Sequence, residues 1–256
     1  MLERFTLSLP GLVPQERTVT VCLPEGYADD PGARYPVLYF FDGQNVFVDE
    51  DASFGKSWGM AAYMRQTGVP VIAVGLESSP VGDNRLVEYS PFTHGTEDLG
   101  IIVGRGRTTL SLLCDAVKPC IDGRYRTLPG RENTAVVGSS MGGLMSLYAV
   151  TKYNNVFSKA ACVSSSIFMV MQPLMDDIYH SDIDPDTRVY LSWGEKEGGT
   201  DPDSGYCKFL TNSNRKVEKL LNRKGAITRL YCQPGGGHCE ADWEKEVPDF
   251  MDFLWK

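Results

Sequence analysis

The stretch AVVGSSMGGLMSLYAV, residues 135–150, changes character in its middle. An apolar run ends at Gly138, two serines and a pair of glycines follow, and an apolar pattern with helical spacing then begins. This order predicts a buried strand that turns directly into a helix. A serine in such a turn is held clear of the backbone, where a substrate can approach it.

The glycine spacing selects one of the two serines. A sharp turn from strand to helix brings backbone segments close together, so the residues two before and two after a nucleophile tend to be glycine. With Ser140 at the centre these positions are Gly138 and Gly142, whereas centring the pattern on Ser139 puts glycine at neither place. We therefore expect Ser140 to be a nucleophile. The competing interpretation is a glycine-rich turn without chemistry.

The rest of the chain alternates strand and helix patterns. Residues 4–9 and 17–23 alternate polar and apolar side chains and predict an antiparallel hairpin. Uniformly apolar runs, typical of parallel strands covered on both faces, occupy 37–41, 71–76, 134–138, 159–163, 188–193 and 227–232. Helical patterns occupy 58–65, 110–121, 142–153, 208–223 and 240–255. The alternation predicts an α/β fold with a mostly parallel central sheet flanked by helices and an N-terminal hairpin.

Composition limits the classes of function. The chain has 256 residues, 42% of them hydrophobic, which is enough for one domain over 1–256. Its formal net charge of −8 argues against nucleic-acid and anionic-membrane partners. The first residues do not resemble a signal peptide, so a cytoplasmic location is expected. Seven scattered cysteines indicate reduced thiols rather than disulfides, and no paired spacing indicates a metal site.

A nucleophilic serine needs a base to remove its proton. In α/β hydrolases the chain order is serine, acid, histidine. Two histidines follow Ser140: His180 in an acidic stretch that resembles a solvated surface, and His238 after three glycines between the last predicted strand and helix. We expect His238 to be the base, the alternative being a capping or surface histidine.

The remaining groups are an acid and two oxyanion donors. The acid should follow the strand at 188–193, where position alone leaves Glu195, Glu197 and Asp201 open. One oxyanion donor should be the amide of Met141, and the second the amide of Gln44 in the loop after 37–41.

Several further motifs make the chain resemble the "putative esterase" (esterase D-like) branch of the α/β hydrolases. This family includes feruloyl and acetylxylan esterases, S-formylglutathione hydrolases, siderophore esterases and mycolyltransferases. The motifs are YFFDGQNVF at 39–47, Arg85 with EYSP at 88–91, KPCID at 118–122, GSSMGG at 138–143, VF at 156–157, GH at 237–238 with Trp243, and FLW at 253–255.

The resemblance implies an α/β-hydrolase fold and a serine esterase that works through an acyl-serine intermediate without a metal or organic cofactor. It also favours Glu197, which ends a Gly-x-x-acid loop as the acid does in relatives. The chain departs from the family at Asp42, where relatives often carry histidine. It departs again at 104–109, which lacks the acidic and aromatic character expected there and leaves the substrate open.

The leading hypothesis is a carboxylic-ester hydrolase with a Ser140–Glu197–His238 triad and a small-molecule ester substrate. An acyltransferase that uses the same acyl-serine and a noncatalytic binding protein on a hydrolase scaffold are the alternatives. Trp58, Arg85 and Phe168 are candidate substrate-binding residues, although core packing is the commoner fate of such aromatics and an ion pair with Glu88 would explain Arg85. Acetyl, feruloyl, thioester and siderophore esters all stay open, as does the oligomeric state.

Overall fold

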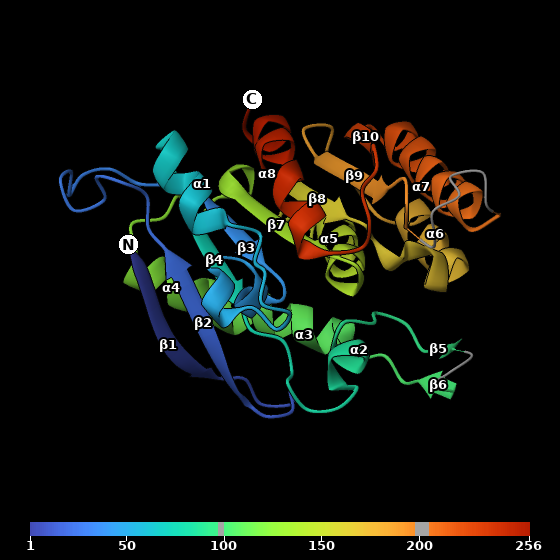
Figure 1. Cartoon of the computed structure of the whole chain (residues 1–256), viewed down its shortest axis with the longest axis horizontal. Coiled ribbons are helices and arrows are strands. Elements are labelled where there is room, and N and C mark those ends of the chain that lie inside the picture. The colour runs from blue at the N-terminus through green and yellow to red at the C-terminus, as the bar shows by residue number, and fades with distance from the viewer. Residues whose placement is uncertain (97–99, 198–204) are drawn as a thin grey trace.

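The computed structural model describes residues 1–96, 100–197 and 205–256. Within them, eight strands form one sheet in the order β1-β2-β4-β3-β7-β8-β9-β10 (Figure 1). The strands are β1 (Leu2–Ser8), β2 (Glu16–Cys22), β3 (Val37–Phe40), β4 (Ile72–Leu76), β7 (Thr134–Ser139), β8 (Lys159–Val163), β9 (Arg188–Gly194) and β10 (Ile227–Gln233). From β4 to β10 neighbouring strands are parallel, while β1 and β2 form an antiparallel hairpin that pairs antiparallel to β4. The predicted α/β class and the mostly parallel sheet are confirmed.

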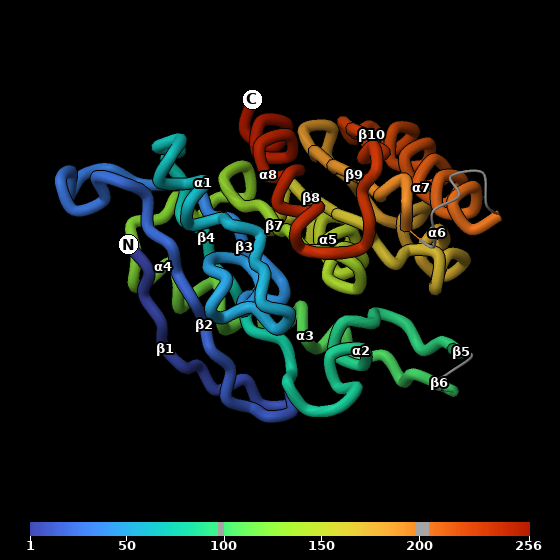
Figure 2. The backbone as a smooth tube through the Cα atoms, viewed as in Figure 1, coloured from blue at the N-terminus to red at the C-terminus, as the bar shows by residue number. Residues whose placement is uncertain are grey.

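Helices cover both faces of this sheet (Figure 2). The helices are α1 (Met60–Thr67), α2 (Asn84–Glu88), α3 (Gly106–Leu112), α4 (Lys118–Arg124), α5 (Met141–Lys152), α6 (Met171–Tyr179), α7 (Gly205–Arg223) and α8 (Glu240–Trp255). Along β3 alternate side chains enter two separate cores. Val37 and Tyr39 pack in the core that also holds side chains of α3, α5, α6 and α7. Leu38 and Phe40 pack in the core that holds side chains of α1 and α8.

Three features differ from the sequence-based expectations. The helix predicted over 110–121 is longer and consists of α3, a π-helical turn at Leu113–Val117 and α4. Pro119 accounts for the break because it has no N–H to continue the α-helical ladder. Outside the predicted strands and helices, the described residues also form α2, α6 and a short antiparallel pair, β5 (His94–Thr96) and β6 (Gly100–Ile102). The last strand, β10, is an edge strand that is only partly covered.

The sheet topology determines where a site can form. Because β3, β7, β8, β9 and β10 run parallel, the loops that follow them all emerge at the same edge. Ligands of open α/β sheets bind at this carboxyl edge. Each residue predicted to take part in catalysis follows one of these strands.

Candidate active site

Ser140 lies at the tip of the turn between β7 and α5. Its backbone adopts φ 55° and ψ −122°, a left-handed conformation that non-glycine residues rarely adopt. The Ser140 amide donates to the carbonyl of Val163 at the end of β8 (3.0 Å), which holds the turn against the neighbouring strand. A Cβ atom on Gly138 would lie 2.6 Å from the backbone of Gly142, so glycine is required for this close approach. The glycine spacing read from the sequence therefore has a direct steric cause.

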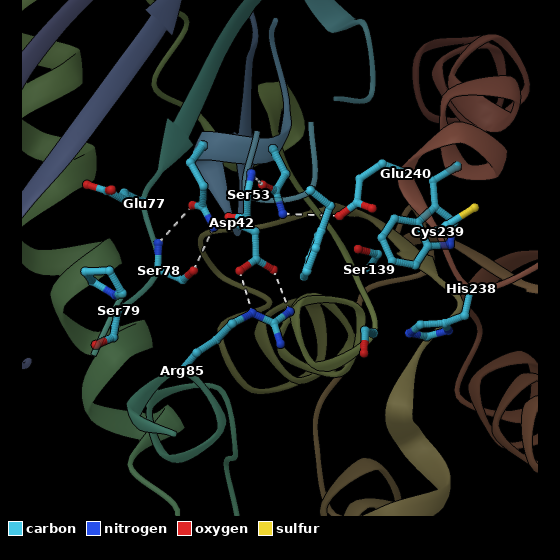
Figure 3. A pocket seen from close by; sticks show the side chains of 16 residues that line it. Asp42, Ser53, Glu77, Ser78, Ser79, Arg85, Ser139, His238, Cys239 and Glu240 are labelled. Atoms are coloured by element: carbon cyan, nitrogen blue, oxygen red, sulfur yellow. Dashed lines mark hydrogen bonds and ion pairs between the residues drawn. The ribbon is translucent and has the colours of Figure 1, made fainter. Parts of the chain in front are cut away.

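His238 lies in the loop between β10 and α8, and its side chain is partly exposed. The ring points into a cavity of about 560 Å³ that Ser140 and Gln44 also line (Figure 3). The edge of the ring packs against Trp243, with centroids 5.1 Å apart and an interplanar angle of 85°. His238 is thus supported from α8 while it lines the cavity.

Glu197 is the carboxylate that contacts this histidine. Its Oε2 lies 3.1 Å from Nδ1 of His238, and its side chain is buried, with the residue 6% exposed. Its Oε1 accepts from the amide of Gly194 (2.6 Å) and from the hydroxyl of Ser164 (2.5 Å). Three hydrogen-bond donors therefore surround one buried carboxylate and fix its orientation.

The other two acids left open by the sequence are placed differently. Glu195 accepts from the amide of Gly235 (2.8 Å), so its carboxylate binds the backbone before the histidine rather than the imidazole. Asp201 lies outside the described residues. A Cβ atom on Gly194 would overlap the carbonyl oxygen of Gly236, so glycine lets the loop after β9 contact the loop that carries His238.

The nucleophile candidate and the histidine share the cavity, and the hydroxyl of Ser140 has a closer neighbour. Its Oγ lies 3.3 Å from Oγ of Ser166, in the loop after β8. The amide of Ser166 also donates to the carbonyl of Ser140 (3.0 Å). Hydrogen bonds between catalytic groups are often long or poorly aligned in free enzymes and tighten when substrate binds. Among the described residues, the side chain of Ser140 thus bonds Ser166 and makes no hydrogen bond to His238.

Two backbone amides near Ser140 are available for an oxyanion. Within residues 1–96, 100–197 and 205–256, neither Gln44 nor Met141 donates its amide to a protein group. Met141 begins α5, where the helix dipole favours negative charge. The side chain of Gln44 is turned away and exchanges two hydrogen bonds with Ser78 (3.0 and 3.2 Å). A Cβ atom on Gly43 would overlap the backbone of Gly75, so the loop after β3 packs directly on β4.

Arg85 binds a residue of this same loop. Its Nε and Nη2 atoms donate to the two oxygens of Asp42 (2.6 and 2.7 Å), as Figure 3 shows. The alternative of an ion pair with Glu88 is wrong, because Glu88 instead binds the buried Arg17 (2.7 Å). The amide of Asp42 donates to the hydroxyl of Tyr89 (3.0 Å). Arg85 therefore lines the cavity while it holds the loop that carries Gln44.

The two aromatic candidates lie in different surroundings. Trp58 is a core residue, 3% exposed, with ring centroids 5.9 Å from Trp243 and 6.1 Å from Phe250, so its expected place in the pocket wall is wrong. A large aromatic in an apolar sequence pattern packs into a core by default. Phe168 lines a second cavity of about 430 Å³ that His238 and Tyr206 also border.

Sequence reasoning missed the three consecutive serines at 164–166. They follow the buried strand β8 at the edge where the other loops meet. Ser164 contacts the candidate acid and Ser166 contacts the candidate nucleophile. A polar triplet placed directly after an apolar run is the signal that could have drawn attention to them. Glu240 was missed as well. It is 7% exposed, lines the cavity and accepts a hydrogen bond from the side chain of Asn45 (3.2 Å). No sequence pattern around Glu240 indicated this position.

Comparison with known proteins places this chain in a family. The model of the family described as "Putative esterase" matches residues 12–253. The chain belongs to this esterase family. Membership makes it a carboxylic ester hydrolase, the enzyme class predicted from the sequence.

The individual relatives described next have low sequence identity to the esterase. "Uncharacterized protein YbbA" of Bacillus subtilis (strain 168) is 25% identical over 248 residues, which cover 93% of this chain and 92% of YbbA. An IroE-like serine hydrolase from Shewanella oneidensis superposes with a TM-score of 0.77 at 19% identity, over 99% of this chain and 79% of that one. A ferulic acid esterase superposes with a TM-score of 0.69 at 17% identity, over 99% and 97%. These structures show that the esterase shares their fold.

Two features are absent from the part of the esterase that the structure describes. No helix there has the length and apolar character needed to span a membrane. In the same residues, no group of three or more His, Cys, Asp or Glu side chains is arranged to hold a metal ion.

Proposed function

We propose that the esterase cleaves its substrate through an acyl-serine intermediate on Ser140, with His238 as general base and acid and Glu197 as the acid of the triad. The observation that carries the proposal is the buried Glu197 carboxylate at 3.1 Å from Nδ1 of a histidine whose ring faces the cavity of the Ser140 turn. Family membership gives the reaction class, and this contact supports the proposed roles of Glu197 and His238.

In the first half of the reaction, Nε2 of His238 accepts a proton. Nδ1–H donates to Glu197, so the neutral ring keeps Nε2 free to accept the Ser140 proton. As Ser140 Oγ bonds to the ester carbonyl carbon, the imidazole becomes positively charged next to the Glu197 carboxylate. The proton then passes to the departing alcohol, and the acyl group stays on Ser140.

The carbonyl oxygen becomes negatively charged during this attack. The amides of Gln44 and Met141 are the proposed donors to it, since both lie at the turn and neither donates elsewhere in the described part of the chain. Losing one donor of this type typically costs about 3 to 4 kcal/mol of transition-state stabilisation. Water, activated by His238, then releases the acid and restores Ser140.

The nucleophile is tested by comparing Ser140→Ala with the wild type on short p-nitrophenyl esters. We expect kcat to fall by at least about 10⁴-fold, because triad members act as a unit. A fluorophosphonate probe should label the wild type and not Ser140→Ala. The neighbouring Ser139→Ala variant should still be labelled, and undiminished hydrolysis by Ser140→Ala would remove this serine from the mechanism.

A further inference from the structure

The serine loop after β8, residues 164–166, touches the proposed triad at two points. All three residues are at least nine-tenths buried. Ser164 has φ 46°, in the left-handed region, and non-glycine residues in that region cost of order 1–3 kcal/mol unless their surroundings hold them. Such strained positions cluster at functional sites. The contacts of Ser164 explain what holds it there.

Ser164 lies in the middle of a directed chain of hydrogen bonds. The indole N–H of Trp243 can only donate, and it donates to Oγ of Ser164 at 2.8 Å. The Ser164 hydroxyl proton is therefore free to point to Oε1 of Glu197, 2.5 Å away. Oε2 of Glu197 then accepts from His238 (3.1 Å). Trp243 thus takes part at both ends of this series of hydrogen bonds. Its indole N–H begins the series, and its ring packs against the imidazole of His238, where the series ends.

The two oxygens of Glu197 consequently have different tasks. Oε1 is occupied by Ser164 and by the amide of Gly194, and Oε2 is left for His238. Because the carboxylate is 6% exposed, these protein donors take the place of water in stabilising its charge. A hydrogen bond to a charged group contributes more than one between neutral groups.

We infer that Ser164 and Trp243 are positioning residues of the esterase, which hold the Glu197 carboxylate in place and aim Oε2 at Nδ1 of His238. This inference rests on the proposed triad. Neither side chain touches the substrate; both act through Glu197. Ser164 has the larger effect because it donates to the carboxylate directly.

The test uses a matched pair of variants in one loop. Ser164→Ala removes the donor to Glu197, whereas Ser165→Ala removes a buried hydroxyl that has no hydrogen-bond partner in the described part of the chain. We expect Ser164→Ala to lower kcat by about 10- to 100-fold with KM within about twofold. The acidic limb of its kcat/KM profile should move to higher pH, because the variant takes one hydrogen-bond donor from the carboxylate that faces the imidazole. Ser165→Ala should match the wild type in both respects.

Trp243→Phe supplies a second, independent arm. It removes the indole N–H and keeps an aromatic ring beside His238, so we expect the same upward shift of the acidic limb with a smaller loss of kcat. Added to Ser164→Ala, it should cost less than it does alone, since the two act along one chain. Thermal unfolding of each variant checks the fold, and Trp243→Phe decides the matter should Ser164→Ala not fold.

The inference is overturned when Ser164→Ala, or failing that Trp243→Phe, gives the kinetics and pH profile of Ser165→Ala. Ser140→Ala separates this outcome from failure of the triad. An inactive Ser140→Ala together with an unaffected Ser164→Ala rejects only the positioning role. An active Ser140→Ala rejects the triad itself.

Discussion

Burial distinguishes Glu197, the proposed acid of this site, from Glu195 in the same loop. Glu195 and Glu197 are two residues apart, yet one binds a backbone amide of the following loop and the other binds His238. Their position in the sequence could not separate them, because the choice depends on which side chain folds back towards Gly194. The family resemblance selected Glu197, and burial gives a physical reason for that choice. Ser140 and His238 were easier to choose, since glycines mark both turns.

Replacing the carboxylate tests this assignment. Glu197→Gln keeps the shape of the side chain but removes the charge that stabilises the imidazolium, so we expect kcat to fall by about 10³- to 10⁴-fold. Glu195→Gln, two residues earlier, should stay within about threefold of the wild type. Steady-state hydrolysis of p-nitrophenyl acetate at pH 8 measures both. Equal losses in the two variants would contradict the assignment of Glu197.

At the level of elements, the strands were predicted to within about two residues because parallel strands buried on both faces are uniformly apolar. Less regular segments were missed. Helix α6 fully buries two side chains, those of Leu174 and Ile178. An apolar stripe this short is hard to recognise in the sequence among polar neighbours. The wrong expectation for Trp58 has a related cause: an apolar pattern shows that a side chain is buried and does not show whether it faces a core or a pocket.

The packing of α8 on β9 buries a second carboxylate, which lines neither of the two cavities described above. Glu246 is 1% exposed, and its Oε2 accepts from the hydroxyl of Tyr190 (3.0 Å). In the described residues its Oε1 has no partner. Burial raises the pKa of Glu246 to about 7 from an ordinary value of 4.5. The folded protein therefore holds a proton here that the unfolded chain has released between these two pH values.

This proton makes the stability of the fold depend on pH. Because the folded state binds more protons between pH 4.5 and 7, the free energy of unfolding should fall as pH rises through this window and level off above it. Glu246→Gln mimics the neutral acid, so it should remove this fall and stabilise the protein at pH 8 by about 1–3 kcal/mol. Urea unfolding at pH 5 and pH 8 measures the difference. Glu244→Gln, at a more exposed position of the same helix, is the control, and an equal pH response in both variants would contradict the prediction.

For the whole molecule, charge is the property that bears most directly on substrate choice. The chain has a formal net charge of −8, and its active-site cavity contains Asp42, Glu77 and Glu240 with one guanidinium, that of Arg85. Arg85 is already paired with Asp42. The cavity therefore presents a negative potential to an arriving ester.

This potential should discriminate against anionic substrates. We expect kcat/KM for p-nitrophenyl hemisuccinate to be at least about tenfold below that for p-nitrophenyl butyrate at low salt. The difference in kcat/KM between the two esters should become smaller in 0.5 M sodium chloride, because salt screens the carboxylates of the cavity. Glu240→Gln should reduce the same difference without added salt. The neutral ester serves as the internal control in each condition. Equal rates for the two esters at low salt would show that the carboxylates do not face the bound substrate.

The loops that form the site follow six different strands, and His238 and Trp243 come after the last of them. During synthesis the chain emerges from the ribosome N-terminal end first. In the proposed triad, Ser140 therefore lacks its base until the last strand and α8 have been synthesised. On the proposed mechanism, hydrolysis requires this C-terminal part of the chain, because a serine hydroxyl without a base is a poor nucleophile.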